Sequence, residues 1–132
     1  MTYAKPEPEL KLIISIGANI ASKLGEPLKT IAAVRPQIEK IIIDWYSALN
    51  SLPIKHQNFD KSLSFKWAPL YETEPVGGPK DQPNFVNTIL VVDGKSFSTI
   101  QPYEKAAIDL MRKFLDLEQT AGRDRKSNAI QW

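Results

Sequence analysis

The stretch NFVNTILVV at residues 84–92 is the clearest strand signal in the sequence and decides the fold. Successive side chains of a strand point to opposite faces, so two sets of side chains alternate along it. The first set is Phe85, Asn87, Ile89 and Val91, and the second is Val86, Thr88, Leu90 and Val92. Because both sets contain apolar residues, the stretch predicts a strand at a central position in a sheet.

The segments before this strand predict another strand and a helix. Residues 10–16 are apolar and rich in β-branched residues, which predicts a strand that ends at Gly17. From Pro27 onward apolar residues recur at helical spacing, and a proline suits the first turn of a helix. We expect Pro36 to kink or split this helix. Residues 50–61 show little periodicity and predict a loop.

The remaining segments predict an edge strand, an irregular loop and a second helix. Phe65, Trp67 and Tyr71 lie in an extended segment, which its proline, Pro69, confines to a sheet edge or a bulge. The prolines and glycines of residues 75–83 predict a rigid, irregular loop. A long helix is expected from Pro102, with Gly122 as its C-terminal cap. Its shared apolar face is predicted to be Tyr103, Ala107, Leu110, Met111, Phe114 and Leu117.

The order of the predicted elements is strand, helix, strand, strand, helix. This order predicts an α+β fold, the beginning of a ferredoxin-like βαββαβ sandwich whose last strand is missing. A chain of 132 residues with 42% apolar residues has room for one core. We therefore expect a single domain over residues 1–132, incomplete at its C-terminus.

Composition narrows the classes of function. A formal net charge of +2 is too small for a protein that coats nucleic acid. Cysteine is absent and His56 is the only histidine, so neither a disulfide framework nor a zinc site is expected. Residues 1–10 lack the apolar run of a signal peptide, and no apolar stretch is long enough to cross a bilayer. We expect a cytoplasmic protein with no nucleic-acid or membrane partner, and a monomer is one expectation for its oligomeric state.

Two segments could present their backbone to a ligand. After the first predicted strand, Gly17 would let a ligand approach and Asn19 could hydrogen-bond it, although an ordinary turn is the alternative. Residues 71–79, YETEPVGGP, contain prolines and glycines that fix an unusual backbone path. Such loops often offer main-chain groups to a ligand, and a stiff connection between strands is the alternative.

Two further segments could contribute side chains to a ligand site. Phe85 and Asn87 share one face of the predicted strand, where an aromatic plane and an amide could hold a flat heterocycle with an amide-like edge. Phe85 could instead belong to the core. Glu118 precedes GRDRK at residues 122–126, whose arginines could clamp polyphosphate oxygens. A solvated basic cap at the helix end is the alternative.

In this order, the four segments resemble the signature of the 6-hydroxymethyl-7,8-dihydropterin pyrophosphokinase family. IGAN at residues 16–19 is similar to the opening of that family, and YETEPVGGPKDQPNFVNTILVV at residues 71–92 resembles its central signature. GRDR at residues 122–125 and the final Trp132 resemble the start of its nucleotide-binding region. The resemblance runs from about Lys11 to the last residue, and the segment 45–64 looks like an inserted loop.

The resemblance implies a reaction and a role for individual residues. The family transfers the β,γ-diphosphate of ATP to the hydroxymethyl oxygen of the pterin in folate biosynthesis, releases AMP and uses two magnesium ions. In-line placement and cationic charge around the phosphates are what this transfer requires. The implied pterin-binding residues are Gly17, Thr73, Pro75, Val76, Phe85 and Asn87, with Phe85 stacking on the ring and Asn87 bonding its pyrimidine edge. The implied ATP-binding residues are Glu118, Arg123, Arg125 and Trp132, and Arg123 and Arg125 are also the implied catalytic residues.

The resemblance also implies an incomplete enzyme. The family continues past the position of Trp132 into two aspartates that bind both magnesium ions, so no metal ligand is expected within these 132 residues. The spacing between Arg125 and Trp132 is also longer than is usual in the family. We expect a truncated, inactive form of a longer enzyme, and the alternative is a non-catalytic pterin-binding module. A third hypothesis, an RNA-binding ferredoxin-like domain, would need exposed aromatic residues on adjacent strands and a basic sheet face.

Overall fold

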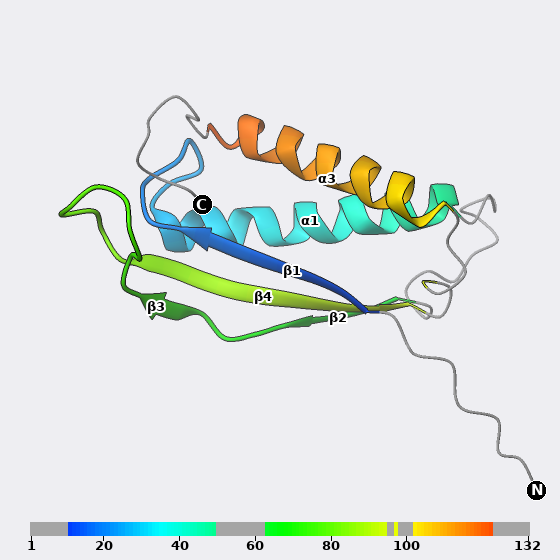
Figure 1. The fold of residues 1–132 in the computed structure, drawn as a ribbon, viewed down its shortest axis with the longest axis horizontal. Helices are drawn as coiled ribbons and strands as arrows, with labels where there is room; N and C mark the ends of the chain where they lie inside the picture. Colours follow the sequence, from blue (N-terminus) through cyan, green and yellow to red (C-terminus); the bar gives the residue numbers. More distant parts are fainter. Residues whose placement is uncertain (1–10, 50–62, 95–96, 98–101, 123–132) are drawn as a thin grey trace, which may run out of the picture.

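A computed structural model describes residues 11–49, 63–94, 97 and 102–122. Within these residues the protein is α+β, with an antiparallel four-stranded sheet and two helices (Figure 1). In chain order the elements are β1 (Lys11–Ala18), α1 (Pro27–Leu49), β2 (Leu63–Trp67), β3 (Tyr71–Thr73), β4 (Phe85–Gly94) and α3 (Tyr103–Thr120). No helix in these ranges is long and apolar enough to cross a membrane.

Strand β4 lies at the centre of the sheet, which confirms the prediction from its alternating pattern. It pairs with β1 along its length, from Lys11 opposite Asp93 to Ala18 opposite Val86. On its other side it pairs with both β2 and β3. The central strand β4 therefore pairs with every other strand that the structure describes.

A β-bulge separates β2 from β3 and contains Pro69. Trp67 lies opposite Leu90 in β4, and Tyr71 lies opposite Asn87, so residues 68–70 face only residues 88–89. The Ala68 N–H donates to the carbonyl of Ile89 at 2.8 Å, and the Thr88 hydroxyl donates to the carbonyl of Ala68 at 2.9 Å. A proline is tolerated here because a bulge releases one residue from the ladder. The prediction for Pro69 is confirmed.

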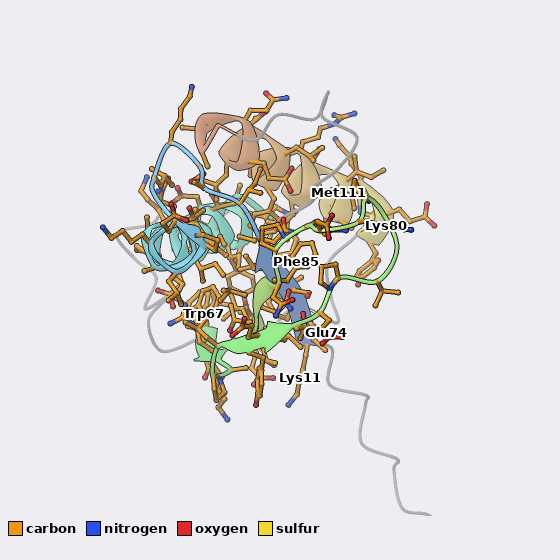
Figure 2. The ribbon with its side chains drawn as sticks, turned by 90° about the vertical axis from the view of Figure 1, so that its left-hand side faces the viewer. Lys11, Trp67, Glu74, Lys80, Phe85 and Met111 are labelled. Atoms are coloured by element: carbon orange, nitrogen blue, oxygen red, sulfur yellow. The ribbon has the colours of Figure 1, made fainter. Side chains whose placement is uncertain are left out.

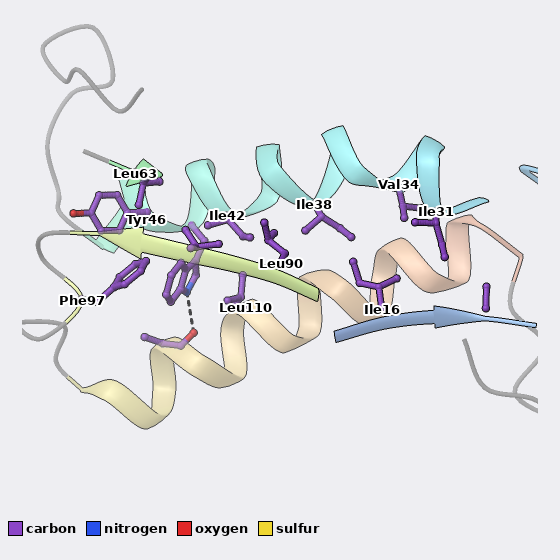
Figure 3. Close-up of a cluster of buried hydrophobic side chains, with 14 residues drawn as sticks. Ile16, Ile31, Val34, Ile38, Ile42, Tyr46, Leu63, Leu90, Phe97 and Leu110 are labelled. Atoms are coloured by element: carbon purple, nitrogen blue, oxygen red, sulfur yellow. Dashed lines mark hydrogen bonds between the residues drawn. The ribbon is translucent and has the colours of Figure 1, made fainter. Parts of the chain in front are cut away.

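Both described helices cover the same face of the sheet, and no helix of the described residues covers the other face, which we call the open face (Figures 1 and 2). The core lies between the helices and the covered face (Figure 3). Across this layer the Trp45 indole donates to the carbonyl of Ala106 at 2.9 Å. The most deeply buried apolar side chains are Ile31, Val34, Ile42, Leu90 and Val92. Burial of such side chains contributes about 1.5–3 kcal/mol each to folding, which makes this layer the main source of stability.

Two boundaries of the predicted elements are corrected by the structure. The first strand does not end at Gly17, because Gly17 is paired with Asn87 and the strand continues to Ala18. Pro36 was expected to kink or split the first helix, and the split is wrong because the helix is continuous over Pro27–Leu49. The carbonyl that would accept the missing hydrogen bond belongs to Ala32, on the exposed side, where water can bond it.

The predicted inserted loop at residues 45–64 is wrong at both ends. Residues 45–49 continue α1, in which Trp45 is buried, and residues 63–64 begin β2. The middle of this segment, including His56, lies outside the described residues. The helical periodicity of α1 simply extends further than the predicted boundary.

The apolar face predicted for the second helix is correct only in part. Leu110 is buried, but Tyr103 and Met111 are exposed, and Ala106 is buried in place of Ala107. The flank that carries Tyr103 and Met111 lines an open apolar cavity of about 360 Å³ beside β1, the last described strand on that side. Gly122 follows the helix with a φ of 87°, as expected of a C-terminal glycine cap.

Candidate functional site

The open face of the sheet brings together four of the predicted pterin-binding residues from three strands. Gly17 of β1 lies opposite Asn87 of β4, and Thr73 of β3 lies opposite Phe85 of β4. Figure 2 shows the end of the sheet where Phe85 lies. Because paired residues of neighbouring strands project to the same face, these four positions form one compact group on the face without helices.

The Asn87 amide lies between Thr73 and Gly17. Its Nδ2 donates to the Thr73 hydroxyl at 2.5 Å. Its Oδ1 faces Gly17 so closely that a Cβ at that position would lie only 2.4 Å away. A larger residue at position 17 would therefore force the Asn87 amide to move. The position of the Asn87 amide therefore depends on the absence of a side chain at Gly17.

Phe85 lies beside the Gly17 backbone, which no side chain covers at that position. Its side chain is half-buried, and Cδ1 of its ring would lie 3.7 Å from a Cβ at Gly17. The ring and the Asn87 amide therefore flank one small area in which β1 carries no side chain. An aromatic ring beside an amide that can donate and accept hydrogen bonds suits a flat heterocycle with a polar edge.

The two predicted pterin contacts in the following loop are not brought to this group. Val76 is fully exposed, and Pro75 is half-buried. The loop of residues 74–84 lies beyond the end of the sheet, between β3 and β4 (Figure 1). It contains three residues with positive φ, namely Gly77, Gly78 and Asp81. The prediction of an irregular loop is confirmed.

Asn19 does not have the ligand-facing position that the sequence suggested. Its side chain is buried, at 2% exposure. Nδ2 donates to Oε1 of Gln82 at 3.0 Å and to the carbonyl of Pro83 at 3.1 Å. Its Oδ1 is buried without a hydrogen-bond partner among the described residues. Asn19 therefore binds the loop that precedes β4, and the idea that it bonds a ligand directly is corrected.

Most of the predicted ATP-binding residues lie outside the residues that the structure describes. Arg123, Arg125 and Trp132 lie beyond the last described residue, Gly122. Glu118 is in α3 and lines a small cavity of about 160 Å³ with Ile14, Ile16 and Leu117 among others. This cavity lies on the helix side of β1, so the sheet separates Glu118 from the group around Asn87.

Sequence reasoning missed two residues of this region. Tyr71 lies directly opposite Asn87 on the open face and is exposed, so it extends the aromatic surface of the site. Tyr71 is two residues from Thr73, so in a strand both side chains project to the same face, and this spacing could have indicated Tyr71. Gln82 accepts the hydrogen bond from Asn19 and donates to the carbonyl of Gly77 at 2.8 Å, so it holds the loop. No local sequence pattern indicated this role, because Asn19 lies 63 residues away.

No family model matches the chain, and no curated protein shows significant sequence similarity to it. In the part of the chain that the structure describes, no group of three or more His, Asp or Glu side chains is placed to hold a metal ion.

Proposed function

We propose that the chain belongs to the 6-hydroxymethyl-7,8-dihydropterin pyrophosphokinase family and that the open face of its sheet binds the pterin. The observation that carries this proposal is the grouping of Gly17, Thr73, Phe85 and Asn87. These residues come from three strands, and the signature that resembles the family predicted all four. The finer description of the fold, a ferredoxin-like sandwich without its last strand, is part of the same proposal and is supported by β4 lying between β1 and β2.

Each of the grouped residues has a chemical role in this proposal. Phe85 stacks on the bicyclic ring, and the bare backbone at Gly17 lets the ring approach the sheet. Asn87 bonds the pyrimidine edge, which offers donors and acceptors in alternation. Thr73 holds the Asn87 amide in the required orientation through their hydrogen bond. Pro75 and Val76 complete the pocket only after the loop has moved, since Val76 is fully exposed.

The nucleotide half of the proposal rests on the resemblance. Glu118, Arg123, Arg125 and Trp132 bind ATP in this proposal, and the two arginines offset the charge of the transferred diphosphate. Because Glu118 lies on the helix side of β1, the proposal requires the phosphates to extend past the end of the sheet to the pterin. Among the described residues, no group of three or more carboxylate or histidine side chains is placed to hold a metal ion. In this proposal the metal-dependent transfer needs aspartates of the kind found in the family, and no step through magnesium follows from this structure. Within the proposal the protein acts in the cytoplasm.

One observation supports RNA binding as a second candidate function. Tyr71 and Phe85 lie on adjacent strands of the open face, which is the arrangement that RNA-binding sheets use to stack bases. The charged residues of this face are mixed, with Lys66 and the Lys11–Asp93 ion pair at 3.5 Å. An RNA-binding face needs a clear excess of positive charge, so the pterin proposal is preferred.

Calorimetric titration of the 132-residue chain with 6-hydroxymethyl-7,8-dihydropterin tests the proposal. The titration includes magnesium and a nonhydrolysable ATP analogue, and a single-stranded RNA of mixed sequence is titrated in parallel. We expect saturable heat with the pterin at one site per chain. Heat with the RNA alone would replace the pterin proposal by the second candidate.

An assay of AMP formation separates the enzyme from a non-catalytic pterin-binding module. A form of the protein that carries the magnesium-binding aspartates should produce AMP only when magnesium and the pterin are both present. Pterin binding without AMP formation in such a form would favour the module. ATP consumption that is independent of the pterin would contradict the family assignment.

A further inference from the structure

We propose that the outer edge of β1 and the cavity between β1 and α3 bind an extended segment of another polypeptide by strand addition. The segment pairs its backbone with β1, and its apolar side chains at alternate positions enter the cavity. We call this surface the β1 slot. The inference goes beyond the proposed function, because the slot lies outside the group around Asn87 and does not depend on pterin binding.

Strand β1 has one edge with which no described strand pairs. Its other edge pairs with β4 over all eight residues, and the strand order β1-β4-β2 places β1 outermost. An outermost strand presents a row of backbone N–H and C=O groups to whatever lies beside it. Charges, prolines and bulges usually prevent a further strand from adding there. Residues 12–18 contain no charge or proline, and their pairing with β4 is continuous, so this edge is suited to strand addition.

The cavity of about 360 Å³ lies at this same edge. On the strand side it is lined by four consecutive residues of β1, namely Leu12, Ile13, Ile14 and Ser15. Consecutive side chains of a strand point to opposite faces, so a cavity that touches all four reaches the edge of the strand. On the helix side it is bounded by residues of α3 that include Tyr103, Ala107 and Met111. Helix α3 therefore lies over the space into which an added strand would fit.

Large apolar side chains are exposed on both sides of this edge. Tyr103 and Met111 line the cavity and are 55% and 61% exposed, and Ile13 of β1 is 64% exposed. Grouped exposed apolar side chains mark interaction surfaces, whereas single ones do not. An added strand has side chains on both of its faces, so it would cover Met111 with one set and Ile13 with the other.

The chemistry of the slot selects its occupant. None of the residues that line the cavity is charged, so a segment with an uncharged cavity side fits, because a charge there would lose its hydration without gaining a partner. A single extended segment also fits better than a second copy of the chain. In a symmetric pair of β1 edges, both α3 helices would compete for the layer above the two strands. Peptides that add a strand to an exposed sheet edge obtain affinity from the backbone and specificity from alternate side chains.

The first experiment titrates the 132-residue chain with a soluble peptide in which valine and threonine alternate and each end has a lysine. Met111→Lys puts a charge into the cavity, and Ile108→Lys is the matched control, since Ile108 is a 50% exposed residue of α3 that does not line the cavity. We expect Met111→Lys to weaken peptide binding about tenfold or more and Ile108→Lys to leave it unchanged. Both variants should keep the thermal unfolding midpoint of the unaltered chain, because both side chains are exposed.

The second experiment measures hydrogen exchange of the backbone amides of β1 by NMR, with and without the peptide. In a strand, the N–H groups that face one neighbour alternate with those that face the other. The peptide should therefore slow exchange at every second residue within residues 12–17 and leave the intervening amides, which face β4, unchanged. A ligand that only filled the apolar cavity would not produce this alternation.

Several outcomes would overturn the β1 slot. They are no peptide binding by the unaltered chain, binding without the alternating protection, and equal affinities of Met111→Lys and Ile108→Lys. Alternating protection of β1 before any peptide is added would assign the slot to a segment of the chain itself or, if sedimentation shows a dimer, to a second copy. Peptide binding without pterin binding would overturn only the proposed function, and pterin binding without peptide binding would overturn only the slot.

Discussion

The two faces of the central strand β4 have different environments. On the helix-covered face Thr88, Leu90 and Val92 are buried, and the apolar side chains pack in the core. On the open face Ile89 is 43% exposed, and Phe85 and Asn87 are only partly covered. An alternation of apolar residues on both faces therefore does not mean that both faces are packed in the described structure.

This difference indicates which face is available for a ligand. Over β4 the covered face is filled by apolar packing, and the open cavity on that side lies beside β1. The open face contains an aromatic ring, an amide and a bare glycine in one place, and folding alone does not require that combination. Substitutions on the covered face should change stability, and substitutions on the open face should change binding.

The largest effect should come from the covered face. Leu90→Ala removes a side chain with no exposed surface and should lower the free energy of unfolding by about 2–5 kcal/mol. Ile89→Ala, its neighbour on the open face, should lower it by about 1 kcal/mol or less, because Ile89 is already partly in water. Urea unfolding followed by circular dichroism measures both values. Equal losses would mean that the two faces are packed alike.

Phe85→Ala should give the next largest effect, on binding. Stacking of an aromatic side chain on a base contributes about 1–3 kcal/mol, so the pterin dissociation constant should rise about 10-fold to 100-fold. Nucleotide binding should change much less, because the ring is on the face opposite Glu118. Calorimetry with each ligand gives the two affinities. Equal weakening for both ligands would exclude a stacking role for Phe85.

Gly17→Ala should weaken pterin binding without unfolding the protein. The added Cβ would overlap Asn87 Oδ1, so the amide must turn away from its position beside Thr73. Loss of one or two hydrogen bonds to the pyrimidine edge corresponds to about a tenfold loss of affinity. Titration should be paired with a thermal melt. Unchanged affinity in a folded Gly17→Ala variant would show that the amide is not used.

The smallest effect should come from the open-face ion pair. Lys11 Nζ lies 3.5 Å from Asp93 Oδ1, and both side chains are substantially exposed. Exposed pairs contribute about 0–1 kcal/mol, so Lys11→Ala should alter the free energy of unfolding by that amount or less. Pterin binding should not change, since the pair is at the opposite end of β1 from Gly17. Urea unfolding at low and high salt measures the contribution, and a pterin-binding defect would extend the site along the whole face.

The sequence allowed much of the sheet to be predicted, because period-two alternation is a local property. It placed β4 at the centre and Pro69 at a sheet edge or a bulge, and it grouped Phe85 with Asn87 on one face. It also predicted the C-terminal cap at Gly122. Each of these depends on residues close together in the chain.

The errors arose where contacts between distant residues decide the structure. Gly17 was predicted to end its strand because glycine is a poor strand former, but pairing with Asn87 keeps it within β1. For Asn19 the sequence left open a hydrogen bond to a ligand or an ordinary turn, but its amide bonds Gln82, 63 residues away. Tyr103 was predicted to pack, but it lies on the flank of α3 that lines the open cavity beside β1. Partners of this kind cannot be read from spacing along the chain.

The central claim, that the pterin binds on the open face, is tested most directly by NMR of isotope-labelled protein. Addition of the pterin, with magnesium and a nonhydrolysable ATP analogue, should shift the side-chain amide signals of Asn87 and the backbone amide of Gly17. The ligand should also show nuclear Overhauser contacts to the Phe85 ring. Contacts confined to the cavity between β1 and α3, around Ala107 and Met111, with the Asn87 and Gly17 signals unmoved, would contradict the account.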